Sequence, residues 1–380
     1  MPSGGLDMAL NNYKLGDLLM RNSEENKDLI YGISDVRGVR NTKGISNTKI
    51  DVSGRNLKTF LVVRPGGFIF NHRVHDKLGL GYNTSDETYI FTNDYVSFYV
   101  KPEVKNRILL PDYLYMWYLR PEFDRYMLFK TYGSATLFFS WDNMCELEIE
   151  LPDLPTQQKY VDVYNAMVAN QQAYERSLED LKLTCDAYIE DLRRKMPCEK
   201  IGRYIERHDI RNGKNGSKNV MGISTSKQFR EPTSKVNKNE LANYKVCHPR
   251  QIGFVQTTHN EKVFTYAFNN TKEDIVVSSV NEVFSTQEDK LYPEYLCMFF
   301  NRTEFDRYAR FHSWGSARET FTWNDLIEVK IPIPDIAIQK SIAEMYTVYN
   351  KRKKINEQLK AQIKNICPIL IRGSLEDGGE

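Results

Sequence analysis

The sequence predicts an α/β protein: two similar mixed α/β globular domains, separated by an antiparallel two-helix coiled coil and related as a pseudo-two-fold internal repeat. Three observations predict this fold. Residues 111–164 are repeated as residues 293–346, with a constant offset and no gap. Each copy runs into apolar residues spaced as in a coiled-coil helix. A length of 380 residues, with 41% hydrophobic and 27% charged residues, suffices for two domains with ordinary cores.

The internal repeat is close enough to indicate duplication of a whole domain. Residues 122–126 and 304–308 are both Glu-Phe-Asp-Arg-Tyr, and residues 133–135 and 315–317 are both Gly-Ser-Ala. A solenoid would show several copies of a unit of roughly 20–50 residues, and this repeat has two copies and a longer period. Two similar domains joined by similar helices can be related by a pseudo-two-fold axis, and double-stranded DNA has two-fold axes as well.

In chain order, each domain is expected to begin with apolar stretches typical of β-strands. Residues 60–70 form such a stretch, and Arg64–Gly67 at its centre predicts a hairpin turn; residues 244–255 are the second copy. Residues 89–100 alternate aromatic and polar side chains, as a half-buried strand does, and residues 275–284 take this place in the second copy.

Helices are expected next in each copy. Pro111 and Pro293 suit the first position of a helix, where the missing N–H costs little. Residues 122–130 predict a second helix, and residues 145–151 predict a returning strand, so the sheet should not be purely parallel. In the Glu-Phe-Asp-Arg-Tyr motif we expect the rings in the core with solvated charges between them; stacking of the rings on bases is the alternative.

A long helix is predicted after each domain. Apolar residues over Gln157–Met196 recur alternately four and three positions apart, with Gln171 as the single polar member, which is the spacing of a coiled-coil seam. The second helix is predicted over Ile338–Ile366; its register slips across a basic run, and Pro368 ends or kinks it. The predicted seam consists of Tyr164, Met167, Tyr174, Leu178, Leu181, Tyr188, Leu192, Ile342, Met345, Tyr349, Ile355, Leu359 and Ile366.

The domain boundaries follow from these two helices. We expect the first domain over residues 12–155 and a central spacer helix over residues 156–196. The second domain should span residues 197–336, with a C-terminal spacer helix over residues 337–372. An antiparallel pairing lets one helix run out and the other run back, which would hold the two domains apart.

Composition excludes several classes of protein. The six cysteines lack Cys-x-x-Cys spacing, which favours free thiols in a reducing compartment. No apolar run is long enough to cross a bilayer as a helix and no signal-peptide pattern is present, so we expect a cytoplasmic protein without a membrane span. His72 and His75 form a lone His-x-x-His, and no metal site is expected. A net charge of +2 is mild for a nucleic-acid-binding protein, so phosphates must be bound by local basic patches or by partner subunits.

Motifs for catalysis are missing as well. The sequence has no Gly-x-x-x-x-Gly-Lys-Ser/Thr, no Gly-x-Gly-x-x-Gly after a strand, and no Asn/Asp-Pro-Pro-Tyr/Phe. Glu328-Val329-Lys330 offers part of a nuclease pattern, but the equivalent Glu146-Leu147-Glu148 lacks the lysine. Alternation of charged and apolar side chains along a strand explains both segments better than a nuclease site does. We therefore expect no catalytic residues and no cofactor.

With these elements in place, residues 13–372 resemble the specificity (S) subunit of a type I restriction-modification system. The resemblance depends on the doubled Gly-Ser-Ala…Trp block, on the Leu-Pro-Asp-Leu-Pro-Thr-Gln of Leu151–Gln157, and on the heptad helix that follows. The second copy has Ile-Pro-Asp-Ile-Ala-Ile-Gln at Ile333–Gln339. The family usually has a Pro-Pro and a Glu-Gln pair at this place, so the departures are small.

The resemblance implies a non-catalytic subunit that binds DNA. Each globular domain would be a target recognition domain for one half of a bipartite site on double-stranded DNA. The coiled coil would set the spacer between the halves and dock two DNA methyltransferase (modification) subunits, and restriction/translocase subunits would join in the full complex. The alternative is a coiled-coil adaptor that assembles partner subunits without binding DNA itself.

Two kinds of segment are candidates for DNA contacts. Residues 71–77 and 257–262 follow matched strands yet differ between the copies, as loops that recognise different half-sites should; drift in a solvent loop is the alternative. The Gly-Ser-Ala turns could present N–H and hydroxyl groups to phosphate, and ordinary turns are the alternative. The candidate DNA-binding residues are Asn71, His72, Arg73, Lys77, Ser134, Thr136, Thr257, Thr258, His259, Lys262, Ser316 and Arg318.

Overall fold

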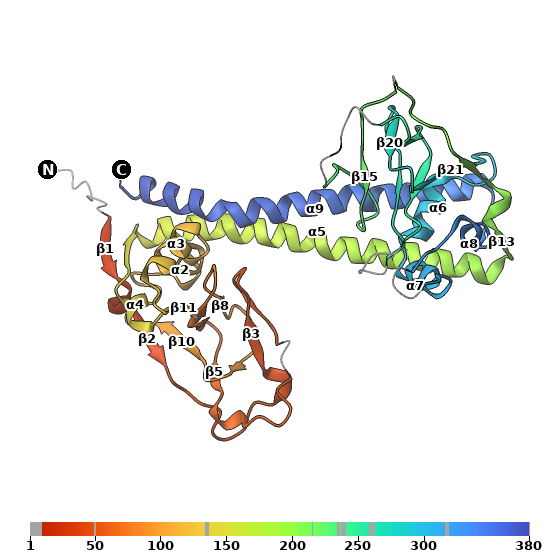
Figure 1. Ribbon diagram of the computed structural model, residues 1–380. Coiled ribbons are helices and arrows are strands. Elements are labelled where there is room, and N and C mark those ends of the chain that lie inside the picture. Colours follow the sequence, from red (N-terminus) through yellow and green to blue (C-terminus); the bar gives the residue numbers. More distant parts are fainter. Residues whose placement is uncertain are drawn as a thin grey trace. The chain divides into compact units, whose positions relative to one another are not determined.

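The chain folds into two units, each containing a sheet-rich domain and one half of each of two long helices (Figure 1). The first unit is Met1–Ala173 with Asn356–Glu380, and the second is Tyr174–Ile355. The two helices are α5 (Leu154–Lys195) and α9 (Ile336–Asp377). The computed structural model describes residues 10–48, 51–133, 137–214, 216–233, 236, 241–257, 263–315 and 319–379.

The first domain is built on a four-stranded antiparallel sheet of order β2-β10-β6-β8. Its strands are β2 (Leu19–Asn22), β6 (Phe68–Asn71), β8 (Leu80–Tyr82) and β10 (Tyr95–Val100). Four two-stranded pairs surround it. These are β1 (Asn11–Lys14) with β12 (Glu148–Leu151), β3 (Arg37–Val39) with β4 (Ile45–Asn47), β5 (Leu61–Val63) with β9 (Tyr89–Phe91), and β7 (Arg73–Val74) with β11 (Leu137–Phe138).

Short helices cover this sheet. Local signals mark the starts of three of them. Proline stands at the first position of α2 and α3, and Ser140 caps α4 by accepting a hydrogen bond from the Asn143 N–H at 3.0 Å. Their rings pack with the sheet in one core that includes Phe68, Phe98 and Tyr118. The helical segments are α1 (Leu15–Leu18), η1 (Ile33–Asp35), η2 (Leu57–Thr59), α2 (Pro111–Tyr118), α3 (Pro121–Lys130) and α4 (Trp141–Cys145).

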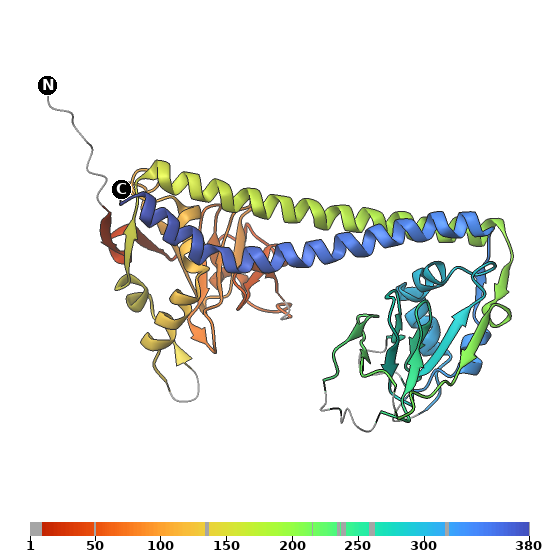
Figure 2. The same cartoon turned by 90° about the horizontal axis from the view of Figure 1, so that it is seen from above.

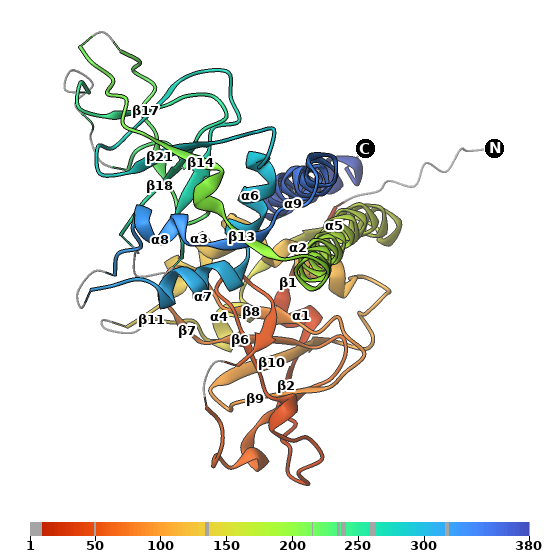
Figure 3. The same cartoon turned by 90° about the vertical axis from the view of Figure 1, so that its right-hand side faces the viewer.

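The second domain repeats this architecture with a sheet of order β14-β21-β18-β19, in which β14, β21 and β18 lie side by side (Figure 3). The duplication expected from the sequence is thus confirmed in the topology. The strands are β13 (Cys198–Lys200), β14 (Ile205–His208), β15 (Gly222–Ile223), β16 (Phe229–Arg230), β17 (Lys245–Cys247), β18 (Ile252–Phe254), β19 (Tyr266–Phe268), β20 (Ile275–Val277), β21 (Glu282–Thr286) and β22 (Lys330–Pro332). The helical segments are η3 (Ile201–Arg203), α6 (Pro293–Phe300), α7 (Thr303–Phe311) and α8 (Trp323–Ile327).

The hairpin predicted at Arg64–Gly67 is wrong, although the chain does turn there. The Gly67 N–H donates to the Arg64 carbonyl at 3.0 Å, but β5 pairs with β9, whereas β6 pairs with β10 and β8. The second copy behaves alike, because β17 pairs with β20 and β18 pairs with β19 and β21. A turn signal fixes where the chain bends, whereas the partner of each strand depends on contacts far along the sequence.

The single strand predicted over residues 89–100 is two strands, β9 and β10. The chain turns between them, where the Tyr95 N–H donates to the Thr92 carbonyl at 3.2 Å. Pairing on both edges of β10, with β2 and β6, buries most of that strand, which alternation alone does not indicate.

Both long helices begin before their predicted first residues, and α9 also ends after its predicted last residue. Helix α9 continues through Pro368 to Asp377. Of the two outcomes expected at this proline, an end or a kink, the end is therefore wrong. The surrounding residues Cys367, Leu370 and Ile371 are buried in the core of the first domain. Their packing offsets the hydrogen bond that proline removes.

Halves of α5 and α9 pair in antiparallel directions within each unit (Figure 2). In the first unit, Lys159 Nζ lies 2.6 Å from an Asp377 carboxylate oxygen, and Gln171 Nε2 donates to Asn356 Oδ1 at 3.0 Å. In the second unit, Arg352 contacts Ser177. The polar seam position Gln171 therefore has a polar partner, and both side chains are buried. Such a pair fixes the register of two helices.

The predicted seam drifts near the end of α5. Tyr188 is 49% exposed, whereas its neighbour Ile189 is fully buried with Cys185 and Ile342. The assignment of Tyr188 to the seam is therefore wrong. A straight helix has 3.6 residues per turn, so a strict heptad pattern moves off the contact face, and a spacing of four residues restores it.

One glutamine anchors each long helix to its domain in the same way. The fully buried Gln157 amide donates to the Ile108 and Pro152 carbonyls, both at 2.8 Å, and accepts from the Leu110 N–H at 3.0 Å. Gln339 repeats these contacts with Lys290, Pro334 and Tyr292 at 2.7, 2.8 and 2.9 Å. This geometry explains why the glutamine appears in both copies of the sequence.

Replacement of Gln157 by leucine should lower the free energy of unfolding of the first domain by on the order of 2–4 kcal/mol, because three buried backbone groups lose their partner. Urea unfolding of the purified chain measures this loss. The matched control is Gln158→Leu, since Gln158 is exposed and bonds to Asp162 alone among the described residues, at 2.7 Å. Equal effects of the two substitutions would contradict the anchoring role.

Candidate nucleic-acid interface

The predicted DNA-contacting residues lie partly outside the described residues. Ser134, Thr136, Thr258, His259, Lys262, Ser316 and Arg318 lie outside the described residues. The glycines that open the two Gly-Ser-Ala turns are described, and Gly133 and Gly315 have φ angles of 120° and 127°. A side chain would be strained at such angles, which explains why glycine stands at both places.

Exposed aromatic residues precede both turns. In the first domain Phe129 is 82% exposed and Tyr132 is 60% exposed; in the second, Phe311 is 84% exposed and Trp314 is 77% exposed. Sequence reasoning missed these four side chains, although both pairs keep the constant offset of the repeat. Large rings exposed at matching places are typical of an interaction surface.

The segment after β6 begins with residues held by local contacts. The Asn71 side chain accepts a hydrogen bond from the Arg73 N–H at 3.0 Å, and Arg73 lies 3.6 Å from Asp94. The His72 ring stacks on Phe138, with centroids 5.5 Å apart and planes inclined by 19°. Lys77 is exposed. In the second domain, Thr257 forms a bridge with Thr320.

A cavity of about 280 Å³ opens beside His72 in the first domain. Its lining combines a cation, rings and acceptors, which suits a partner with both polar edges and flat faces. The lining includes Arg21, Tyr132, Phe138, Ser140, Trp141 and Asp142.

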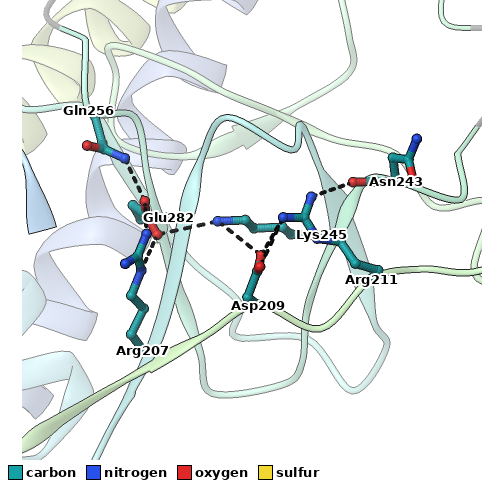
Figure 4. A network of polar contacts seen from close by, with 7 residues as sticks. All are labelled: Arg207, Asp209, Arg211, Asn243, Lys245, Gln256 and Glu282. Carbon is teal, nitrogen blue, oxygen red and sulfur yellow. Dashed lines mark hydrogen bonds and ion pairs between the residues drawn. The ribbon is translucent and has the colours of Figure 1, made fainter.

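The second domain has an ionic cluster around two buried residues, Glu282 and Lys245, at the matching place. We name it the Glu282 cluster: Arg207, Asp209, Lys245, Gln256 and Glu282 (Figure 4). Glu282 is 2% exposed and Lys245 is 4% exposed. Arg207 donates to both Glu282 oxygens, at 2.6 and 2.8 Å. Asp209 lies 3.4 Å from Lys245 and also pairs with Arg211 at 2.8 Å.

A buried lysine bonds to the repeated Asp in each copy of Glu-Phe-Asp-Arg-Tyr. Lys43 Nζ donates to Asp124 at 2.8 Å and to the Tyr118 carbonyl at 2.5 Å. Lys227 repeats both bonds with Asp306 and the Phe300 carbonyl. Both lysines have positive φ, 64° and 62°, at the tips of the hairpins β3–β4 and β15–β16. The expectation of solvated charges is therefore wrong for these aspartates.

These lysine–aspartate pairs position the outer hairpin of each domain. The side chain of Lys43 is 4% exposed and that of Lys227 is 7% exposed, and burial lowers the pKa of both amines while the bond to aspartate opposes that shift. In the same motif, Phe123 and Phe305 are buried, as the sequence predicts.

Within the described ranges, no three His, Cys, Asp or Glu side chains come together as ligands of a metal ion would. None of the helices in the described part of the chain has the length and hydrophobicity needed to span a bilayer.

Comparison with known proteins identifies the second half of the chain. Residues 199–365 match the family of type I restriction modification DNA specificity domains. The matched stretch is similar to a type I DNA specificity domain. The match confirms the family that the sequence resembles. The first domain lies outside the matched residues, yet it shares the strand order, the anchoring glutamine and the buried lysine of the specificity domain.

A solved structure supports the same fold for the whole chain. The S subunit of a type I restriction-modification system from M. genitalium is 10% identical, with a TM-score of 0.58 over 99% of this chain and 98% of that chain. The HsdS subunit from Thermoanaerobacter tengcongensis is 12% identical, with a TM-score of 0.38 over 96% of each chain. A chain from a structure on assembly and conformational transition of the type I R-M system is 13% identical, with a TM-score of 0.46 over 96% of this chain and 98% of that chain. Among curated proteins, none matches the sequence.

Proposed function

We propose that the chain is the sequence-specific DNA-recognition subunit of a type I restriction-modification complex, with each domain recognising one half of a bipartite site. One observation supports this most. The two domains share strand order and structural bonds, yet they differ in polar side chains at one matching place, where the first domain has His72 and Val96 and the second has Gln256 and Glu282. An adaptor that only assembles partners has no use for such a difference.

The same proposal assigns the partners and excludes catalysis by this chain. The long helices α5 and α9 would dock two DNA methyltransferase subunits and set the spacer, and restriction/translocase subunits would join the full complex. The exposed faces of these helices, which include Val163, Leu183 and Val348, are available for such contacts in the chain alone. The chain itself would bind no cofactor.

Methylation mapping tests the proposal directly. The chain and its methyltransferase subunits are produced together in cells, and methylated adenines are located across the genome. We expect a single bipartite sequence with a fixed spacer. A chain in which residues 12–155 are exchanged for the first domain of another specificity subunit should change one half-site only. Methylation that does not depend on which chain is present would favour the adaptor.

Replacement of two matching arginines, Arg21 on β2 and Arg207 on β14, should change the salt dependence of DNA binding to different extents. Arg207 is already paired with Glu282. Arg21 forms no ion pair with any described residue and is exposed. Replacing Arg21 by glutamine should therefore reduce the slope of log affinity against log salt by about 0.9, the value for one phosphate contact, whereas Arg207→Gln should change it less.

Fluorescence anisotropy of a labelled duplex with the assembled complex, at a series of KCl concentrations, measures both slopes. Equal losses of slope in the two variants would contradict the assignment of a free charge to Arg21.

A further inference from the structure

His72 and Gln256 occupy the same position in the two domains. The backbone carbonyl of His72 accepts a hydrogen bond from the Phe139 N–H at 2.9 Å, and that of Gln256 accepts from the Phe321 N–H at 2.8 Å. Both residues follow the inner strand of their sheet and begin the segments whose sequences diverge. Gln256 is not among the residues that the sequence alone singles out.

The neighbours of these two residues differ in chemistry. Strand register places Val96 opposite Phe70 in the first domain and Glu282 opposite Phe254 in the second, so Glu282 replaces Val96. The valine fits an apolar position without cost. A buried carboxylate at the same place has to be paired with cations, and a hydrophobic side chain would serve stability at least as well.

Glu282 holds two side chains at once. Its Oε1 accepts from Gln256 Nε2 at 2.5 Å and from Arg207 Nη2 at 2.6 Å, and its Oε2 accepts from Arg207 Nε at 2.8 Å. Lys245 Nζ lies 3.4 Å from Oε2 on the buried side. The carboxylate is therefore fixed by two cations and in turn fixes the amide of Gln256 (Figure 4).

This bond determines which way the amide faces. An ionised carboxylate only accepts hydrogen bonds, so the NH₂ group of Gln256 has to face Glu282. The carbonyl oxygen Oε1 then points away from the cluster, as Figure 4 shows, and no described residue donates to it. An oriented acceptor of this kind matches a hydrogen-bond donor. In the major groove, the donors on base edges are the N6 amine of adenine and the N4 amine of cytosine.

We propose that Gln256, oriented by Glu282, recognises the exocyclic amine of an adenine or cytosine in the half-site bound by the second domain. Gln256 is the specificity-determining residue and Glu282 is a positioning residue. The first domain has an imidazole at this position, stacked on Phe138, and so selects its base differently. This inference rests on the proposed function of DNA recognition.

The experiment uses the chain assembled with its methyltransferase subunits and maps methylated adenines in a randomised DNA library. For Gln256→Leu we expect discrimination at one base pair of the second half-site to fall by between about 5-fold and about 150-fold, the usual effect of losing one base contact. Glu282→Gln should relax the same base pair. The first half-site and the spacer should stay as they are in both variants, which is the internal control.

Duplexes without the amine give the decisive readout. Purine replaces adenine, or 2-pyrimidinone replaces cytosine, at that base pair. The wild-type complex should methylate the modified duplex more slowly by the same factor, whereas the Gln256→Leu complex should not distinguish it from the normal duplex. Preserved discrimination in Gln256→Leu, or a uniform loss at all base pairs in Glu282→Gln, would overturn the inference. A wild-type complex with no bipartite preference would instead refute the proposed function.

Discussion

Replacement of Asp124 by leucine should destabilise the first domain by about 3–5 kcal/mol, because the substitution leaves the buried amine of Lys43 without a counter-charge. Hydrogen exchange followed by mass spectrometry should show lost protection in residues 10–133 and little change in residues 263–315. Asp306→Leu should instead lower protection in residues 263–315 and leave residues 10–133 little changed. Asp306 also accepts from the Phe264 N–H at 3.0 Å, so its loss removes a further bond.

The effect of Asp124→Leu should also depend on pH. Burial already lowers the pKa of Lys43 below its ordinary value, and the bond to Asp124 opposes this shift. Without Asp124 the pKa falls further in the folded state, so the unfolded chain binds more protons than the folded chain. Stability of the variant should therefore rise as pH increases from the folded-state pKa of Lys43 towards about 10.4, the unfolded value.

Two controls separate a buried charge from a lost contact. The double variant Lys43→Met/Asp124→Leu removes both charges and should recover much of the lost stability. Glu122→Gln breaks an exposed pair with Arg125 (3.2 Å, side chains 48% and 71% exposed) and should cost less than about 1 kcal/mol. A cost for Asp124→Leu as small as that of Glu122→Gln would show that water reaches Lys43.

The second large effect should come from lengthening both long helices by one heptad. Seven residues inserted between Ser177 and Leu178 of α5, and seven between Lys351 and Arg352 of α9, face each other because Arg352 contacts Ser177. The bonded pair Gln171–Asn356 then keeps its register on one side of the insertion. The added length is about 10 Å at 1.5 Å per residue.

If the paired helices set the gap between half-sites, the spacer should grow by up to about three base pairs at roughly 3.4 Å each. The bases of both half-sites should stay the same, since neither domain is altered. Methylation mapping measures the number of base pairs between the two half-sites. The matched control inserts seven residues in α5 alone, which places the two helices out of register and should abolish methylation. An unchanged spacer in the double insertion would show that another element measures the gap.

The sequence predicts those elements whose signals are local. Proline at the start of α2 and α6, and the heptad pattern of α5, are each contained in one segment, and they place the helices correctly. Strand partners are not local, which is why the turn signal at Arg64–Gly67 wrongly predicts a hairpin. Ile189 replaces Tyr188 in the seam because a heptad count ignores the drift of a straight helix.

The candidate site is harder to predict from the sequence, because its residues do not keep the constant offset between the two copies. The motif aspartates Asp124 and Asp306 keep that offset, but their lysine partners Lys43 and Lys227 stand slightly further apart. The same larger separation holds for His72 and Gln256. Because of insertions between the copies, a comparison of the sequence with itself at the constant offset does not align either pair. The backbone bonds to Phe139 and Phe321, together with the strand register, show that His72 and Gln256 are equivalent.

The core of the first domain contains Cys367, Leu370 and Ile371, and Tyr113 Oη lies 2.6 Å from Ser374 Oγ, a residue 261 positions later. During synthesis, at roughly 5–20 residues per second, this contact has to wait on the order of half a minute after Tyr113 has been made. Every residue of the second unit lies within Tyr174–Ile355, so that unit has its complete core earlier. We therefore expect the first domain, although it leaves the ribosome first, to complete its core after the second unit has done so.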